Sequence, residues 1–252
     1  MALLGRLFRL PLDDATRSME AILRGRGPFA ALAPLVAAIA IAWIVYVPIH
    51  ELLHALGCAA AGGSVSELQI QAVYGGAVLA RVFDFVVVGG EYAGRLSGFD
   101  THGSDLVYLA TVLTPYLLSV FPGVALLHLA ARRASPWLFG VAVVLALAPI
   151  YNIPGDYFET GSILTTRVAT WLGAGSGDPS FAALRSDDVL ALIGSLAAGD
   201  VEAGASHWIV VAISLVLSTL LAFLTYALGE RVARLLAAAE SERGAAIDCD
   251  AS

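Results

Sequence analysis

The sequence contains nineteen consecutive residues without a charged side chain, from Phe29 to Val47. About 20 apolar residues in a helix are enough to cross the hydrocarbon core of a bilayer. The whole chain has the same character, because 58% of its residues are hydrophobic, 14% are charged and the mean hydropathy is +0.80. Soluble domains carry about 25% charged residues. The composition therefore predicts an α-helical integral membrane protein with the lipid bilayer as its surroundings.

The charge and the cysteine content exclude two other classes of protein. The formal net charge is -7 and the pI is about 5.1, whereas a nucleic-acid-binding protein needs a basic surface. We therefore expect no nucleic-acid partner. The two cysteines, Cys58 and Cys249, lie in an apolar segment and in a polar tail, so the sequence does not indicate a disulfide framework.

Hydropathy predicts about four transmembrane helices. The first begins at Phe29 and continues through the sequence HELLH to Gly62-Gly63, a typical helix stop. The three later spans are Asp105 to Ala131, Pro136 to Ile153, and His207 to about Leu228.

Between the first and second spans, the sequence predicts a small β-hairpin. Ser66 to Tyr74 alternates apolar and polar residues, and Ala77 to Val88 is rich in β-branched residues. The pair Gly75-Gly76 between them is typical of a hairpin turn. We expect the stretch from Gly90 to Asp105 to be a loop. Because unpaired strand edges are not tolerated in hydrocarbon, the hairpin should lie at the interface or be enclosed by helices.

We expect three regions along the chain. Residues 1–28 carry five arginines among apolar residues, which indicates an amphipathic segment at the membrane interface. Residues 29–236 form a single membrane-embedded domain, and residues 237–252 form a polar C-terminal tail.

The arginines predict the orientation in the membrane. Ten of the fourteen lie in the N-terminal segment, the 132–133 turn and the C-terminal segment. By the positive-inside rule, both termini lie in the cytoplasm of what we expect to be a bacterial cell membrane. The HELLH end of the first span and the Asp156 end of the third then share the outer face.

The motif His50-Glu51-Leu52-Leu53-His54 predicts a metal site. Residues four apart lie on one face of a helix, so both imidazoles can reach one cation. Neutral imidazole is a good ligand for Zn²⁺, which takes four ligands and can keep one position open for water. In known uses of this spacing, the glutamate acts as general base. We therefore expect Zn²⁺ as the cofactor, His50 and His54 as metal ligands, and Glu51 as a catalytic residue.

A zinc hydrolase of this kind needs a third protein ligand. Asp156 is the favoured candidate, because it follows Asn152 at a helix–membrane boundary on the same predicted face as HELLH. Glu159 stays open as an alternative. Cys58 continues the face of His50 and His54, but it is better suited to packing. The other histidines that we considered are His102, His128 and His207.

These residues resemble the site-2-protease-like intramembrane metalloproteases. The resemblance covers His50, Glu51 and His54, the small residues Cys58 and Gly62, and the segment of Asn152, Pro154 and Asp156. Two features differ from the family pattern. The Asn-to-Asp spacing is shorter here and Tyr157 follows the aspartate, and the arginines place the site outside, whereas family members generally place it toward the cytosol.

The resemblance implies a zinc-dependent endopeptidase that hydrolyses a peptide bond in or near a transmembrane segment. Glu51 would act as general base on the zinc-bound water, and the Asn152 amide would stabilise the developing oxygen charge. The implied partner is a membrane-protein or peptide substrate. Because a helix hides its carbonyl groups, the substrate must unwind, and an edge of the 66–88 hairpin could hold it in extended form.

Two other functions are compatible with the motif. The first is a non-catalytic membrane scaffold or metal-binding protein that keeps the HExxH site without turnover, although metal binding alone does not require Glu51. The second is a metal transporter, which should repeat ligands along several helices. The second and fourth spans offer only His128 and His207, near their ends.

Overall fold

The computed structural model describes residues 2–173, 179–200 and 204–250, and this part of the chain is mostly helical with one small sheet. The α-helices are α1 (Ala2–Arg26), α2 (Pro28–Ala60), α3 (Gly76–Leu79), α4 (Asp105–Leu113), α5 (Val124–Arg133), α6 (Pro136–Ala146), α7 (Ala148–Tyr151), α8 (Asp156–Trp171), α9 (Val189–Ala198) and α10 (Ala205–Asp250). The strands are β1 (Ser64–Ile70), β2 (Val86–Val88) and β3 (Gly94–Asp100).

Three helical segments of the described chain are long and apolar enough to cross a membrane. They are Pro28–Ala60, Asp105–Arg133 and Ala205–Glu240. Their existence supports the prediction of a helical membrane protein. The expected span from Pro136 to Ile153 is two shorter helices, α6 and α7, separated at Leu147.

Local chemistry explains where the main helices begin. Gly27, with φ 76°, ends α1, and Pro28 opens α2 at a position where no backbone N–H is needed. The Ser104 hydroxyl accepts a hydrogen bond from the Val107 N–H at the start of α4. At the other end of α2, Gly62 takes φ 96°, which turns the chain toward β1.

The chain packs as two compact units. The first unit comprises residues 1–43, 116–148 and 223–252, and the second comprises residues 44–115 and 149–222. These are units of packing, and the single membrane domain over residues 29–236 stays a prediction.

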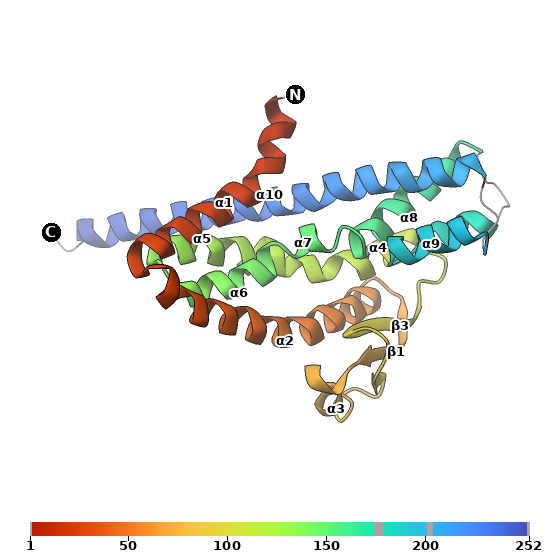
Figure 1. Cartoon of the computed structure of the whole chain (residues 1–252), viewed down its shortest axis with the longest axis horizontal. Helices are drawn as coiled ribbons and strands as arrows, with labels where there is room; N and C mark the ends of the chain where they lie inside the picture. Colours follow the sequence, from red (N-terminus) through yellow and green to blue (C-terminus); the bar gives the residue numbers. More distant parts are fainter. Residues whose placement is uncertain (1, 174–178, 201–203, 251–252) are drawn as a thin grey trace. The chain divides into compact units, whose positions relative to one another are not determined.

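Helix packing builds the core of the first unit. In Figure 1, α5 and α6 lie side by side, and α1 packs against both. Ile22 of α1, Leu127 of α5, Phe139 of α6 and Tyr226 of α10 are buried in one apolar cluster. The polar C-terminal tail expected from residue 237 continues the α10 helix as far as Asp250.

The second unit contains the sheet and the remaining helices. β1 is the central strand, with β2 parallel to it on one side and β3 antiparallel on the other. Leu68, Ile70 and Val86 of the sheet are buried in one apolar cluster, against which Leu79 and Phe83 pack. A second apolar cluster joins α8, α9 and α10 through residues such as Phe158, Leu192 and Val211.

The predicted two-stranded hairpin is wrong in detail. Gly75, with φ 84°, ends a 3₁₀ turn at Ala72–Tyr74 and starts the short helix α3, so the glycine pair is not a hairpin turn. The second strand is only Val86–Val88, and it runs parallel to β1, which a tight turn does not permit. The segment expected to be a loop contains β3, the antiparallel partner of β1.

Close packing of α8 on α10 depends on Gly161. A Cβ atom at this position would lie 2.6 Å from the Ser214 carbonyl oxygen and would also clash with Ser218. Small residues allow this approach between helices in membrane proteins. We expect Gly161→Val to destabilise the protein by about 1–3 kcal/mol through overpacking.

The measurement is the thermal unfolding midpoint in detergent. The matched control is Gly194→Val on α9, where a Cβ atom meets no atom within 4 Å. Equal midpoints for the two variants would show that α8 and α10 do not pack as described.

Candidate metal centre

Helices α2 and α8 bring three ligand atoms of the second unit together. His50 and His54 lie one turn apart on α2, and Asp156 is the first residue of α8. His50 Nε2 lies 3.1 Å from His54 Nε2 and 3.1 Å from Asp156 Oδ2. The His54 Nε2 to Asp156 Oδ2 distance is 3.5 Å. These three side chains form a group that could hold a metal ion.

Hydrogen bonds at the opposite ring nitrogens fix both imidazoles. His54 Nδ1 lies 2.8 Å from the Thr111 carbonyl oxygen, which can only accept, so Nδ1 carries the proton and Nε2 offers its lone pair to the cluster. His50 Nδ1 lies 2.7 Å from the Tyr46 hydroxyl. Such outer partners are typical of metal-ligating histidines.

The triangle of ligand atoms fits a tetrahedral ion. Bonds of about 2.0–2.1 Å at tetrahedral angles separate neighbouring ligands by about 3.3 Å. The three distances between the ligand atoms, 3.1, 3.1 and 3.5 Å, lie close to this value. Two imidazole nitrogens and one carboxylate oxygen also match a catalytic zinc site, with a fourth position left for water or substrate.

Asp156 and Glu159 have different surroundings, which bear on the choice of third ligand. Burial opposes ionisation of Asp156, but the two histidines outweigh it and hold the pKa of this carboxyl below its ordinary value. Burial raises the pKa of Glu159 to about 7. In addition, Glu159 Oε1 accepts a hydrogen bond of 2.5 Å from the Tyr108 hydroxyl. Asp156 is thus the ionised carboxylate beside the histidines, and Glu159 is engaged elsewhere.

The remaining candidate ligands lie outside this group. His102 is exposed and pairs with Asp100, and His207 is buried against the Phe181 ring. The Cys58 thiol is fully buried and contacts the Ser64 carbonyl oxygen at 3.7 Å. His128 belongs to a different cluster, in the first unit.

Strand β3 positions the Glu51 carboxylate. Glu51 is 9% exposed and accepts a hydrogen bond from the Leu96 backbone N–H. Gly94 lies directly against it, since a Cβ atom there would be 2.5 Å from Glu51 Cγ. The glycine at the start of β3 thus leaves the space that this carboxylate occupies.

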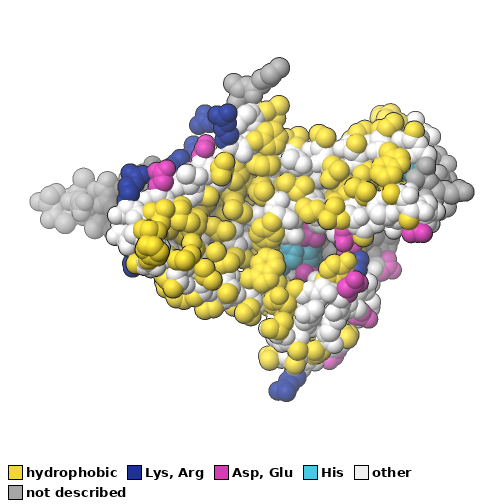
Figure 2. All heavy atoms as spheres, in the orientation of Figure 1, with side chains coloured by type: hydrophobic (Ala, Val, Ile, Leu, Met, Phe, Trp, Pro, Cys, Tyr) yellow, Lys and Arg dark blue, Asp and Glu magenta, His cyan; other side chains and the backbone are white. Residues whose placement is uncertain are grey.

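A cavity of about 590 Å³ opens onto the cluster. Its wall includes His50, His54, Glu51, Asp156 and Asn152. Figure 2 shows histidine and acidic side chains gathered in a hollow among apolar side chains. The Asn152 side chain does not cap α8, whose N-cap is Gly155 without a side-chain hydrogen bond.

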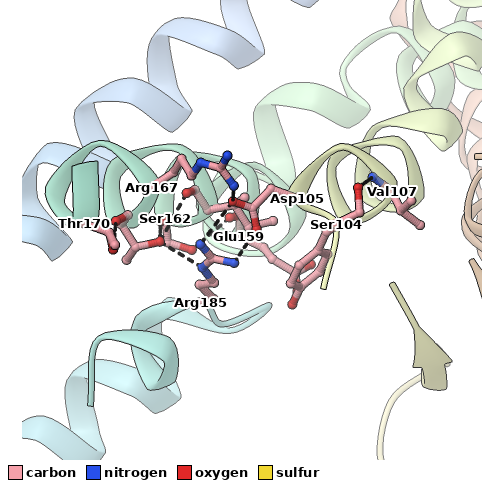
Figure 3. Close-up of polar contacts among 11 residues, drawn as sticks. Ser104, Asp105, Val107, Glu159, Ser162, Arg167, Thr170 and Arg185 are labelled. Carbon is pink, nitrogen blue, oxygen red and sulfur yellow. Dashed lines mark hydrogen bonds and ion pairs between the residues drawn. The ribbon is translucent and has the colours of Figure 1, made fainter. Parts of the chain in front are cut away.

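Arg185, Arg95 and Asp187 of the cavity wall make ion pairs that the sequence did not reveal. The Asp105 carboxylate forms ion pairs with Arg185 (Nη1 to Oδ1, 2.7 Å) and with Arg167 (Nη1 to Oδ2, 2.9 Å). Figure 3 shows both guanidinium groups directed at this carboxylate. Arg95 of β3 pairs with Asp187 at 2.9 Å. These pairs join residues at least 62 positions apart, so no local pattern could indicate them.

Tyr46 is another residue that the sequence analysis missed, although a signal was present. It precedes His50 by four positions and therefore shares the helix face of both histidines. A hydroxyl at that spacing is a natural partner for the outer ring nitrogen.

Comparison with known proteins found no matching family model, no matching curated protein and no matching solved structure. The resemblance to intramembrane metalloproteases therefore depends on the motif residues alone.

Removing the Tyr46 hydroxyl should weaken metal binding at His50. We expect Tyr46→Phe to lower the affinity of this site for Zn²⁺ by about 10–100-fold, because the imidazole loses the partner that orients it. Competition with a zinc-chelating dye measures the affinity. Tyr74→Phe, in the apolar cluster under the sheet, is the control and should leave the affinity unchanged. Equal affinities of Tyr46→Phe and wild type would contradict the orienting role.

Proposed function

We propose that this chain is a zinc-dependent intramembrane endopeptidase that hydrolyses a peptide bond in or near a transmembrane segment. The observation that carries the proposal is the triangle formed by His50 Nε2, His54 Nε2 and Asp156 Oδ2. It lies on a cavity that also exposes Glu51. Metal binding alone would not need this fourth ionisable group, whose burial is costly.

Each residue has a distinct part in the proposed reaction. A zinc ion held by the three ligand atoms would supply Lewis acidity, which activates water and polarises a carbonyl group. Glu51 accepts the proton of the attacking water and returns it to the leaving amine. The Leu96 N–H and the close approach of Gly94 hold its carboxylate in place. The Asn152 amide, on the same cavity wall, donates to the oxygen on which negative charge develops.

Strand β3 is the proposed binding edge for the substrate. It is an edge strand of the sheet, since its only strand partner among the described residues is β1. Arg95, Leu96 and Ser97 of this strand line the cavity. An unwound substrate segment could add to this edge by main-chain hydrogen bonds and present its carbonyl group to the site. This replaces the 66–88 hairpin edge that the sequence suggested.

We further propose four membrane crossings, with both termini in the cytoplasm. The crossings would be α2, the segment Asp105–Arg133, the pair α6–α7, and α10. The arginine distribution supports this orientation and places the metal centre toward the outer face.

Glu51→Gln tests the reaction. Because the amide cannot accept a proton, we expect the cleavage rate to fall by about 10²–10⁴-fold while the bound metal is retained. The zinc-loaded protein would be incubated in detergent with membrane-derived peptides, and cleavage products would be counted by mass spectrometry. Metal content would be measured on the same samples.

The control is Glu20→Gln, which changes an exposed glutamate of α1 that pairs with Arg24. It should leave both cleavage and metal content unchanged. Full activity of Glu51→Gln would refute the mechanism. A zinc-loaded wild type without cleavage of any peptide would favour a non-catalytic membrane scaffold.

Gly94→Ala tests whether β3 positions the base. The added methyl group would displace Glu51, and a displacement of about 1 Å can lower a catalysed rate by about 10²-fold. We expect slower cleavage with unchanged zinc affinity. Gly98→Ala on the same strand is the control, because its Cβ atom would contact Ser66 and Glu67 of β1 instead. An equal loss in both variants would mean that general disruption of β3, and not displacement of Glu51, lowers the rate.

A further inference from the structure

A second cluster of potential ligands lies in the first unit. Asp14 of α1, His128 of α5 and Glu230 of α10 place one ligand atom each within 4.8 Å of one another. Asp14 and Glu230 are 3% and 5% exposed. His128 Nε2 lies 2.7 Å from Glu230 Oε2 and 3.7 Å from Asp14 Oδ2.

Two of the three inner atoms of this cluster lack hydrogen bonds. His128 Nε2 and Glu230 Oε2 are both buried, and neither has a hydrogen-bond partner even though they are 2.7 Å apart. The oxygen therefore does not lie where a ring N–H could donate to it. A nitrogen lone pair and a carboxylate oxygen this close repel each other unless a cation lies near both.

Neighbouring groups pair with both carboxylates of this cluster. Arg234 lies 2.6 Å from Glu230 Oε1, and Arg17 lies 3.5 Å from Asp14 Oδ1. The Tyr226 hydroxyl donates to Asp14 Oδ2 at 3.1 Å. Both arginine side chains are more than 60% exposed, so water screens their charges. Glu230 Oε2 thus faces the imidazole without a hydrogen bond of its own.

An ion from solution could reach the cluster. A cavity of about 840 Å³ in the first unit is lined by Asp14 and His128, together with Arg17 and Arg132. This space also gives room for water molecules, which would complete the coordination of an ion held by three protein atoms.

We propose that Asp14, His128 and Glu230 form a second metal site, which binds a divalent first-row transition-metal ion. One imidazole nitrogen and two carboxylate oxygens suit Mn²⁺, Fe²⁺ or Zn²⁺. The 2.7 Å separation is close to the spacing of about 3 Å between adjacent ligands in a six-coordinate site with bonds near 2.1 Å. The ion links α1, α5 and α10, and its binding does not depend on the proposed protease activity.

Cobalt titration tests the second site. Metal-free protein in detergent would be titrated with Co²⁺, and both bound metal and visible absorption would be recorded. We expect two equivalents per chain in the wild type. His54→Ala should remove one equivalent, and His128→Ala or Glu230→Gln should remove the other. The control is His102→Ala, which changes an exposed histidine and should keep both.

The His54→Ala variant tests the second site even where the changes at His128 or Glu230 prevent folding. This variant leaves the first unit intact, so it must still bind one equivalent of Co²⁺. A wild type that binds one equivalent, combined with none in His54→Ala, would overturn the second site and identify the cluster as an ion pair. Retention of two equivalents in His128→Ala would overturn it as well.

Discussion

Burial of ionisable groups is the constraint on which the second unit depends. His50, Glu51 and His54 are all between 7% and 9% exposed on an apolar helix. Such groups are costly in a membrane protein unless each has a partner. The partners come from four different elements: the Thr111 carbonyl of α4, Asp156 of α8, the Leu96 N–H of β3 and Tyr46 of α2 itself. Within this unit, α4, α8 and β3 are therefore arranged so that each of these three buried side chains has a polar partner.

Site residues could be predicted where they form a pattern of residues that are close together in the sequence. The spacing of His50 and His54 places both on one helix face, and Asn152 and Asp156 stand together at a helix boundary. The helical, membrane-compatible character of the chain follows from its long apolar runs. These features depend on residues that are close in sequence, which is where periodicity carries information.

The sheet was predicted poorly, because strand pairing is a tertiary property. The sequence Gly94–Asp100 contains two glycines and several polar residues, which alone favour a loop. It becomes a strand because β1 supplies its hydrogen bonds, and Glu51 requires a residue without a side chain at Gly94. Likewise, β2 pairs with β1 in parallel, a connection that needs more chain than a turn of two glycines.

The same strand would link the position of Glu51, the proposed general base, to the proposed recognition of the substrate. The Leu96 N–H that holds Glu51 belongs to β3, which is also the free edge beside the cavity. The ion pair between Arg95 and Asp187, both of which line the cavity, also anchors this strand. A peptide that adds to the edge would stiffen β3 and, with it, the position of the carboxylate. In the proposed enzyme, substrate binding and alignment of the base would both depend on β3, which would couple the reaction to an extended substrate.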